Sequence, residues 1–402
     1  MIHHMLKIVW NRKSSNALII LEVFVSFLVV FAVTAALIFS WSTYQRPLGY
    51  EWEDVWHVLF RLGDTENLDK EATAEANETV KRLVREIETL DPVVRAAAGH
   101  YPPYLRDDWS WSWTTSDERE IRTEIIRATP EFAEALQIET VGGRWFEASD
   151  AAMHWKPVVI NRRLARDLFG DEDPIGQRVD KGEPDEDDDE LRVVGLIEDY
   201  RKGGELAAPR NILFQPAWMD GSGPPLTHLA IRLTPGTSAA FEETLTERMQ
   251  EVAPEWSFSV RQLATKREQY LRLTLAPLFA AGVVAGFLIL MVALGLVGVL
   301  WQNVTQRTLE VGLRRAKGAT RPHIHWQILG EMMTIATLGM ALGILVVVQV
   351  PVLGWFSFLD LSTYVRAFVV SIATIYLLSA VCGLYPSWLA ARIQPAEALH
   401  YE

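Results

Sequence analysis

Few residues of this 402-residue chain have the types and spacing that catalysis or metal binding requires. Pro184–Glu190 contains six carboxylates, but Ca²⁺ coordination needs ligands spaced around a turning loop with a glycine. The nine histidines lack H-E-x-x-H spacing and a cysteine partner. Neither a G-x-x-x-x-G-K-[ST] phosphate loop nor a G-x-S-x-G nucleophile turn is present. We therefore expect a non-catalytic chain with no cofactor of its own, in which the acidic run is a solvated hairpin tip.

A basic segment carries the other chemical signature. Glu310–Pro322 holds four cations between two long apolar runs. Glu310 and Arg314 have the i, i+4 spacing of a favourable helical ion pair. Gly318 is placed to end that helix, and Pro322 to begin the next one. The spacing predicts a helical hairpin; a loop that only obeys a charge rule would explain the cations but not the glycines.

Four apolar stretches are long enough to cross a membrane, which takes about 20 mostly apolar residues in a helix. They are Ala17–Phe39, Ala276–Leu300, Ile328–Val350 and Ala367–Tyr385. The chain is therefore expected to be a membrane protein with four transmembrane α-helices. A large α+β extracytoplasmic domain lies between the first and second of them.

Charge sets the expected orientation. The short segments before the first span and after the second are basic, and short cytoplasmic loops carry an excess of Lys and Arg. The long polar block is acidic and is placed outside, where its charge argues against nucleic acid as a partner. The expected layout is a cytoplasmic amphipathic N-terminus over 1–16, spans over 17–40, 274–301, 327–351 and 367–386, the extracytoplasmic domain over 41–273, a cytoplasmic loop over 302–326, a short external loop over 352–366 and a cytoplasmic tail over 387–402.

The extracytoplasmic block alternates helix and strand patterns. Val80, Leu83, Val84 and Ile87 recur at helical spacing, which predicts a helix over Asn67–Leu90. Further helices are expected over 161–169 and 238–252, and strands over 157–160, 191–197, 211–214, 229–233 and 257–260. This mixture indicates α+β layers around one core.

Three tryptophans alternate with serines in this block. Trp109, Trp111 and Trp113 fall on one face of a strand, because successive side chains of a strand point to opposite sides. The simpler interpretation packs that face on the domain core. Otherwise the indoles form an exposed aromatic patch, and they are the first candidate for a partner surface in the domain.

Two glycine pairs occur inside the expected spans. Gly282-x-x-x-Gly286 lies in the second and Gly339-x-x-x-Gly343 in the third. Small residues at this spacing allow helix backbones to approach closely. Together the pairs predict tight packing within the bundle or between two copies.

Three sets of motifs resemble the FtsX/MacB-type permeases of ABC transporters. The segment Glu310–Thr320 is similar to the family pattern E-I-G-x-R-[RK]-A-x-G-A-[ST], with Lys317 where an apolar residue is usual. Tyr385–Leu399 is similar to the family's Y-P-[AS]-x-x-A-A-R-x-x-P-x-E-A-L ending. Short motifs between Gly143 and Asp199 resemble the MacB-like periplasmic core.

The resemblance implies a multi-pass permease of the bacterial inner membrane, with both termini cytoplasmic and a second permease, identical or related, as partner. It implies docking on a cytoplasmic ABC ATPase dimer, which would bind ATP and Mg²⁺. Because only some fifteen residues precede the first span, we expect that ATPase to be a separate chain. The implied docking residues are Glu310, Gly312, Leu313, Arg314, Arg315, Ala316, Lys317, Gly318 and Ala319.

The output of such a permease is left open by the sequence. Coupling of ATP hydrolysis to movement of the periplasmic domain would serve export of a peptide, antibiotic or other amphiphile, with an adaptor and an outer-membrane channel. The alternatives are extraction of lipoproteins, or signalling without transport that activates a cell-wall hydrolase. A receptor with a sensory ectodomain is a more distant alternative, because it does not account for the three later spans.

Overall fold

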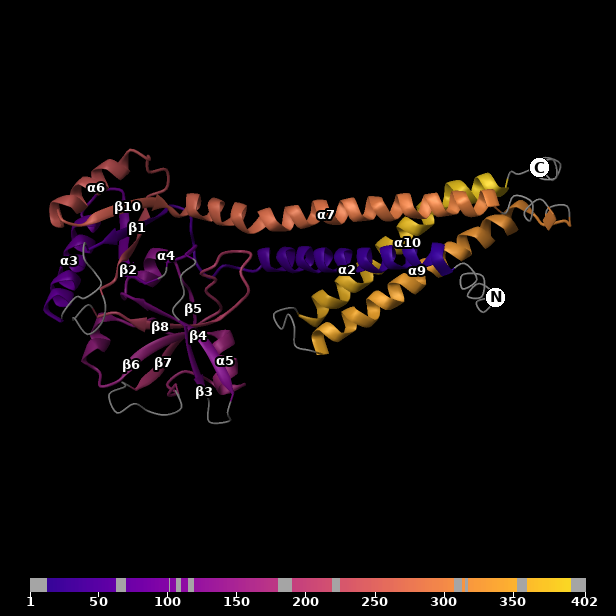
Figure 1. The fold of residues 1–402 in the computed structure, drawn as a ribbon. Coiled ribbons are helices and arrows are strands. Elements are labelled where there is room, and N and C mark those ends of the chain that lie inside the picture. The colour runs from indigo at the N-terminus through magenta and orange to yellow at the C-terminus, as the bar shows by residue number, and fades with distance from the viewer. Residues whose placement is uncertain are drawn as a thin grey trace. The chain divides into compact units, whose positions relative to one another are not determined.

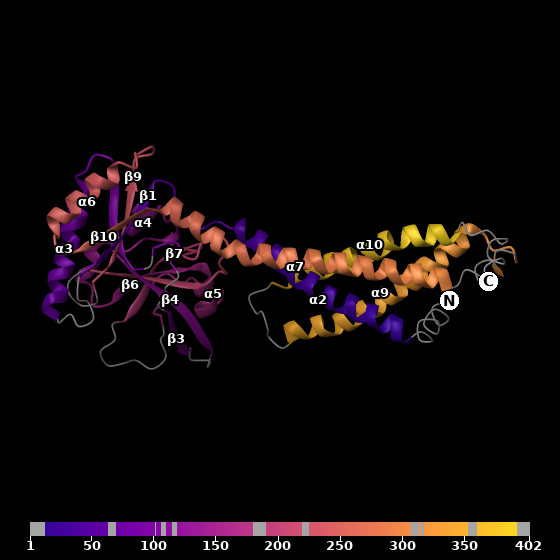
Figure 2. The same ribbon diagram turned by 45° about the horizontal axis from the view of Figure 1, so that its top comes forward.

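The computed structural model describes residues 13–62, 70–100, 102–105, 110–114, 119–179, 190–218, 225–306, 313–314, 317–352 and 360–391. The chain divides into two compact units (Figures 1 and 2). Thr43–Thr274 forms the unit that contains the strands, called here the core domain. Met1–Ser42 and Leu275–Glu402 form the other unit, which is helical where it is described.

The helical unit confirms the four expected transmembrane helices. It is built from α2 (Lys13–Tyr44), α7 (Leu263–Gln306), α9 (Arg321–Val352) and α10 (Leu361–Ala391). Each has a stretch long and apolar enough to cross a membrane. α7 begins well before the span expected at 274, because its first turns belong to the core domain.

The four helices share one apolar core. α2 contributes one face, whose buried residues are Ile19, Val23, Phe27, Phe31 and Ala35. The remaining members come from the other three helices: Val292 and Leu296 of α7, Met332, Ile335, Met340 and Val347 of α9, and Ala367, Ile375 and Cys382 of α10. α9 and α10 also share a polar contact, between the hydroxyls of Thr337 and Tyr376 at 2.9 Å.

One half of the core domain has a split β-α-β pattern. Its strands are β1 (Val55–Arg61), β2 (Val93–Gly99), β9 (His228–Leu233) and β10 (Ser257–Gln262), and its helices are α3 (Lys70–Glu88) and α6 (Phe241–Val252). The spatial order is β10-β1-β9-β2, and every neighbouring pair is antiparallel. This is the ferredoxin-like arrangement, in which each helix links two strands that have a third strand between them.

The helices α3 and α6 lie side by side on one face of that sheet (Figure 1). Trp56, Val58 and Phe60 point to this face at alternate positions of β1. They meet Leu83 and Ile87 from α3, which recur at the helical spacing seen in the sequence. The alternation of strand residues and the amphipathic helix thus bury the same core from two sides.

The chain between β2 and β9 builds the other half. Its strands are β3 (Ser110–Thr114), β4 (Glu120–Ala128), β5 (Thr140–Gly143), β6 (Lys156–Asn161), β7 (Leu191–Ile197) and β8 (Asn211–Pro216). Its helices are α4 (Phe132–Leu136), α5 (Arg162–Phe169) and the 3-10 turn η1 (Ala148–Ala152). β4 joins β2 at Gly99 and Ala128, so both halves share one ten-stranded sheet.

Asn161 links three parts of this second half. Its side-chain oxygen accepts from Leu164 N at 3.1 Å, capping α5, and from Ile212 N at 3.2 Å. Its amide nitrogen donates to Asp199 Oδ1 at 3.1 Å and to Arg210 O at 2.8 Å. The residue is fully buried, so these four bonds satisfy it without water.

Most helices and strands expected in the core domain are present, but β1, β2 and β4 are among the strands that were not expected. β1 begins at the end of the aromatic, proline-bearing stretch Trp41–Trp56. β2 buries three consecutive alanines, which carry no strand signal, and β4 lies directly after the tryptophan segment. The acidic run at Pro184–Glu190 lies outside the described residues up to Asp189, so its hairpin tip remains a prediction.

Candidate functional site

The segment expected to dock an ATPase is partly described. Leu313, Arg314, Lys317, Gly318 and Ala319 have defined positions. Glu310, Gly312, Arg315 and Ala316 lie outside the described residues, and so does the expected Glu310–Arg314 pair.

Gly318 ends a helical turn, as its spacing in the sequence predicts. Its φ is +96°, a conformation that glycine adopts without strain. Lys317 N donates to Leu313 O at 3.0 Å, and Ala319 N donates to Arg314 O at 3.0 Å. The second bond closes the six-residue ring of a Schellman motif around Gly318. Thr320 O then accepts from His323 N and Ile324 N, which starts α9.

This turn presents an apolar side chain next to cationic ones. Leu313 is 52% exposed, and Lys317 is exposed as well. Arg314 is half-buried, and its Nη1 donates to Gln327 Oε1 of α9 at 2.8 Å. The turn is therefore fixed to α9 by Arg314, while Leu313 and Lys317 remain available to a partner.

The two glycine pairs have different environments. A Cβ at Gly339 would lie 2.8 Å from Val23 Cβ, and one at Gly343 would overlap the Phe27 ring. Hence this pair lets α9 approach α2 closely. A Cβ at Gly282 or Gly286 would meet no described atom within 4 Å, so the pair in α7 packs on nothing within the described chain.

A third close approach was not anticipated from the sequence. A Cβ at Gly295 of α7 would overlap the Glu22 carboxylate of α2. The sequence shows Glu22 as a charged residue inside an apolar run, which is the signal that such a contact leaves.

The tryptophan segment forms the expected strand. β3 pairs antiparallel with β4, with Trp111 opposite Thr123 and Trp113 opposite Ile121. Trp111 is partly buried and packs against the core that β4, β6 and α5 share, which is the simpler of the two interpretations. Trp109 and the side chain of Trp113 lie outside the described residues, so an aromatic patch there remains a hypothesis.

The core domain holds a buried hydrogen-bonded chain that sequence reasoning missed. Lys266 Nζ lies 2.7 Å from His57 Nδ1, and His57 Nε2 lies 2.9 Å from His228 Nδ1. A lysine ammonium can only donate, so His57 accepts at Nδ1 and donates from Nε2. The contact ties the first turns of α7 to β1 and β9.

Burial keeps these histidines neutral. It lowers the pKa of His57 well below its usual value, with the Lys266 charge acting in the same direction. Burial, again with Lys266, lowers the pKa of His228 to about 4. Burial and the neighbouring Arg261 lower the pKa of Lys266 to about 8. No sequence motif marks these three hydrogen-bonded residues, because they lie far apart along the sequence.

A second anchor holds the same end of α7. Arg267 Nε is ion-paired with Glu205, and its guanidinium lies over the Trp52 ring at 4.4 Å from the centroid. The Glu205 carboxylate also accepts from Tyr104 at 3.4 Å. α7 therefore enters the core domain with two consecutive cations held by buried partners.

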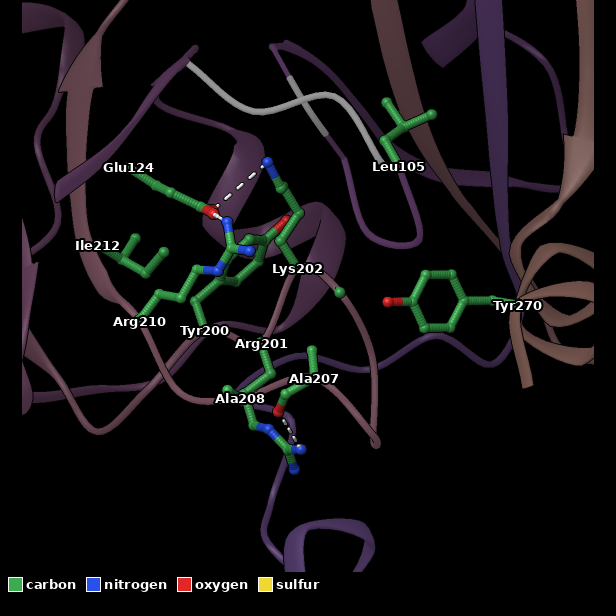
Figure 3. Close-up of a pocket in the computed structure, with 11 residues that line it drawn as sticks. Leu105, Glu124, Tyr200, Arg201, Lys202, Ala207, Ala208, Arg210, Ile212 and Tyr270 are labelled. Atoms are coloured by element: carbon green, nitrogen blue, oxygen red, sulfur yellow. Dashed lines mark hydrogen bonds and ion pairs between the residues drawn. The ribbon is translucent and has the colours of Figure 1, made fainter. Parts of the chain in front are cut away.

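Arg201 fastens the loop that follows β7 to the end of α2. Its Nη1 donates to the carbonyls of Thr43 at 2.8 Å and Arg46 at 3.0 Å. Its Nη2 donates to the carbonyls of Glu205 and Ala207. Beside this loop lies a cavity of about 230 Å³ into which Lys202, Arg210 and Glu124 converge (Figure 3).

Within the described residues, no cluster of three or more histidine, cysteine or carboxylate side chains has the geometry to hold a metal ion.

Two family profiles match the sequence. The MacB-like periplasmic core domain matches residues 20–248, and the FtsX-like permease C-terminal domain matches residues 282–395. The first match alone covers more than half of the chain.

Known proteins are similar to most of this chain. The macrolide export ATP-binding/permease protein MacB of Bdellovibrio bacteriovorus is 25% identical over 347 residues, which are 81% of this chain and 49% of the relative. The Bacillus subtilis ABC transporter permease YknZ is 26% identical over 279 residues, 67% of either chain. The periplasmic region of MacB from Actinobacillus actinomycetemcomitans aligns with 57% of this chain and 97% of its own at a TM-score of 0.38 and 12% identity. The chain spans about half the length of the MacB relatives it matches.

Proposed function

This chain belongs to the ABC transporter permeases that have a MacB-like periplasmic core domain and an FtsX-like permease domain. We propose that the permease transmits movement from a partner ATPase to the permease's own core domain. The permease is a multi-pass protein of the bacterial inner membrane. The finer elements of the proposal are the docking site, the coupling path and the output.

The docking site is the turn at Leu313–Ala319, and its geometry is the observation that carries the proposal. The Schellman turn at Gly318 fixes the backbone, and Arg314 fastens it to α9. Leu313 and Lys317 are then held outward on a rigid support. An apolar anchor with a cation beside it suits a partner groove that has an apolar floor and an acidic rim. This docking face would lie on the cytoplasmic side, as its basic charge indicates.

The coupling path is α7. It is one continuous helix from Leu263 to Gln306. Its first turns are held to the core domain by Lys266 on His57 and by Arg267 on Glu205. We take a displacement of one end of this helix to be passed to the other end through its continuous backbone hydrogen bonds. The buried anchors therefore support transfer of movement to the sheet of the core domain.

The output we propose is export of an amphiphile. The MacB relatives are named as macrolide exporters, and the similarity covers both the core domain and the permease part. The complex would contain two permeases and two ATPase subunits, with a periplasmic adaptor and an outer-membrane channel as further partners. Gly282 and Gly286, whose surroundings are open among the described residues, support a contact with a second permease on that face of α7.

The test combines co-purification with ATPase rate. Leu313→Asp with Arg314→Glu is expected to abolish recovery of the ATPase with the permease and to remove the permease-dependent part of ATP hydrolysis. Gly318→Ala forces an alanine into positive φ at a cost on the order of 1–2 kcal/mol and should weaken docking. Unchanged recovery and unchanged rate in the double variant would refute the docking site.

Gly236→Ala is the matched control. Gly236 also has a positive φ, +83°, and a Cβ there also meets no described atom within 4 Å. It lies between β9 and α6 of the core domain, away from the proposed docking turn. Equal loss of ATPase recovery in Gly236→Ala and Gly318→Ala would show that backbone strain, and not docking, is responsible.

A further inference from the structure

A carboxylate lies inside the membrane-spanning part of α2. Glu22 is the only acidic or basic residue in the sequence between Lys13 and Tyr44, and α7 has none from Leu273 to Gln306. Glu22 lies five residues inside the span expected to start at 17, which at 1.5 Å per residue is roughly 8 Å from the expected cytoplasmic end. An ionisable side chain at such a depth is rare and generally has a function.

The carboxylate lies against the backbone of α7. A Cβ at Gly295 would be 3.2 Å from Glu22 Oε1 and 3.2 Å from its Cδ, and it would overlap Oε2. The carboxyl group thus occupies the space that any other residue at 295 would fill with its own side chain. Gly295 lies six residues inside the span expected to end at 301, so both residues lie at a similar depth.

Buried side chains flank this contact on both helices. On α2, Ile19 and Ser26 lie one turn before and one turn after Glu22, and each is 1% exposed. On α7, Val292 and Leu296 belong to the apolar core of the helical unit. The part of Glu22 that these helices leave uncovered faces hydrocarbon, because the residue lies within the span.

The titratable groups of the other two helices lie at a distance along them. α9 approaches α2 where Gly339 meets Val23. Glu331 lies eight residues before Gly339, roughly 12 Å along α9, and as a second carboxylate it would not offset a negative charge on Glu22. The remaining titratable residues of α9 and α10 are Arg321, His323, His325, Tyr364, Arg366, Tyr376, Cys382 and Tyr385.

These surroundings suit the neutral form of the carboxyl group. Apolar side chains and hydrocarbon disfavour an ionised carboxylate, whereas the neutral acid has an O–H that can donate. Gly295 leaves the backbone of α7 uncovered, so the acid can donate to a main-chain carbonyl of that helix, which has a second lone pair.

From this arrangement we propose that Glu22 is a proton-binding site within the membrane, and that its protonated form holds α2 against α7 at Gly295. The carboxylate takes the proton from water at the expected cytoplasmic ends of the two helices and returns it there. The step therefore needs no oxidant, reductant or second reactant.

Loss of the proton changes the contact at Gly295. The ionised carboxylate moves toward water, and the O–H that held it to α7 is gone. Because α7 is the proposed coupling path, its contact with α2 then depends on protonation of Glu22. This consequence rests on the proposed function, whereas proton binding by Glu22 does not.

The experiment labels the full chain with dicyclohexylcarbodiimide in phosphatidylcholine nanodiscs at neutral pH. This apolar reagent adds to protonated carboxyl groups at membrane depth. The tryptic peptide 14–46 has Glu22 as its only side-chain carboxyl group, so mass spectrometry of that peptide reports the adduct. We expect the wild type to be labelled, and Glu22→Gln to lack the adduct.

Gly295→Ala displaces the carboxyl group with little effect on the helix core, because the atoms that its Cβ meets are the far end of a flexible side chain. Labelling should fall about tenfold or more, since a carboxyl group with the ordinary pKa near 4.3 is almost wholly ionised at neutral pH. Gly298→Ala is the matched control, because it lies one turn further along α7 and its Cβ meets no described atom within 4 Å. It should be labelled like the wild type.

Infrared spectroscopy gives a second readout, which needs no reagent. The C=O band of a neutral acid is separate from the bands of an ionised carboxylate, and we expect it in the difference between wild type and Glu22→Gln at neutral pH. Thermal unfolding in the same nanodiscs verifies that each variant is folded.

Any one of three results overturns the proposal: no adduct on Glu22, the bands of an ionised carboxylate in the infrared difference, or equal labelling of Gly295→Ala and Gly298→Ala. None of these measurements involves the ATPase, so a negative result here is distinct from a failure of the docking site.

Discussion

Gly343→Ala is the sharpest test of how the helical unit packs. A Cβ at Gly343 would overlap the Phe27 ring, with Cε1 at 3.1 Å and Cγ at 3.3 Å. Phe27 is fully buried, so its ring has no space to move into. Gly286 offers the matched comparison, because it also lies within a long apolar helix and a Cβ there meets no described atom within 4 Å.

The magnitudes follow from two opposed effects. Alanine is favoured over glycine in a helix interior by roughly 0.5–1 kcal/mol. Overpacking a close contact costs typically about 1–3 kcal/mol, and the buried ring at Phe27 places Gly343 in the upper part of that range. The net change is a loss of about 1–2 kcal/mol for Gly343→Ala. For Gly286→Ala it is a gain of about 0.5–1 kcal/mol in the single chain.

The assay is reversible unfolding of the full chain in mixed micelles of detergent and dodecyl sulfate, followed by circular dichroism at low protein concentration. A double-mutant cycle with Phe27→Leu isolates the contact, because the smaller side chain should relieve most of the cost of Gly343→Ala. The reasoning is refuted if Gly343→Ala is as stable as Gly286→Ala, or if Phe27→Leu leaves the cost unchanged.

Two further predictions concern the core domain. Burial lowers the pKa of His228 in the folded state to about 4, below the usual 6.5, so the unfolded chain binds more protons between these two values. The contribution of His228 to stability should therefore be complete above pH 6.5 and decline as the pH falls toward 4. Urea midpoints measured across that range should fall less steeply for His228→Gln than for the wild type. Asn161→Ala removes the cap of α5 and three other buried bonds, and we expect a loss of about 2–4 kcal/mol in urea unfolding, since a cap contributes about 1 kcal/mol and each orphaned buried group costs about 1–3 kcal/mol.

Each of these predictions has an outcome that contradicts it. The same pH slope in His228→Gln and wild type would show that other groups set the acid sensitivity. A loss below about 1 kcal/mol for Asn161→Ala would mean that water replaces the amide, which contradicts full burial of the residue.

Local patterns in the sequence were sufficient for the membrane architecture. Hydropathy over about 20 residues is a property of one segment, so the four apolar helices needed no tertiary information. The Gly318 stop is equally local, because a positive φ and the six-residue ring of a helix end involve only neighbours in the chain. Most helices and strands of the core domain were also visible from periodicity.

Strands made of small or mixed residues were not predictable. Ala96 and Ala98 in β2 are fully buried in the core that α3 and α6 cover, and Ala97 is fully buried in the core on the other face of the sheet, so their burial comes from what packs on the two faces. Alanine by itself favours helix over strand, so the environment overrides the local preference.

The buried polar contacts of the core domain depended entirely on tertiary structure. Glu124 and Lys202 meet because β4 and β8 pair in parallel and the loop before β8 folds over them. His57 and His228 meet because β1 and β9 are neighbours although the second half of the domain separates them in sequence.

The two glycine pairs also show the difference between what the sequence determines and what the tertiary structure determines. Gly282-x-x-x-Gly286 and Gly339-x-x-x-Gly343 have identical spacing, and the sequence gives no reason to separate them. Only the fold places α2 against the pair in α9 and no described residue against the pair in α7. Spacing along a helix fixes which residues share a face, whereas the partner of that face depends on how distant segments pack.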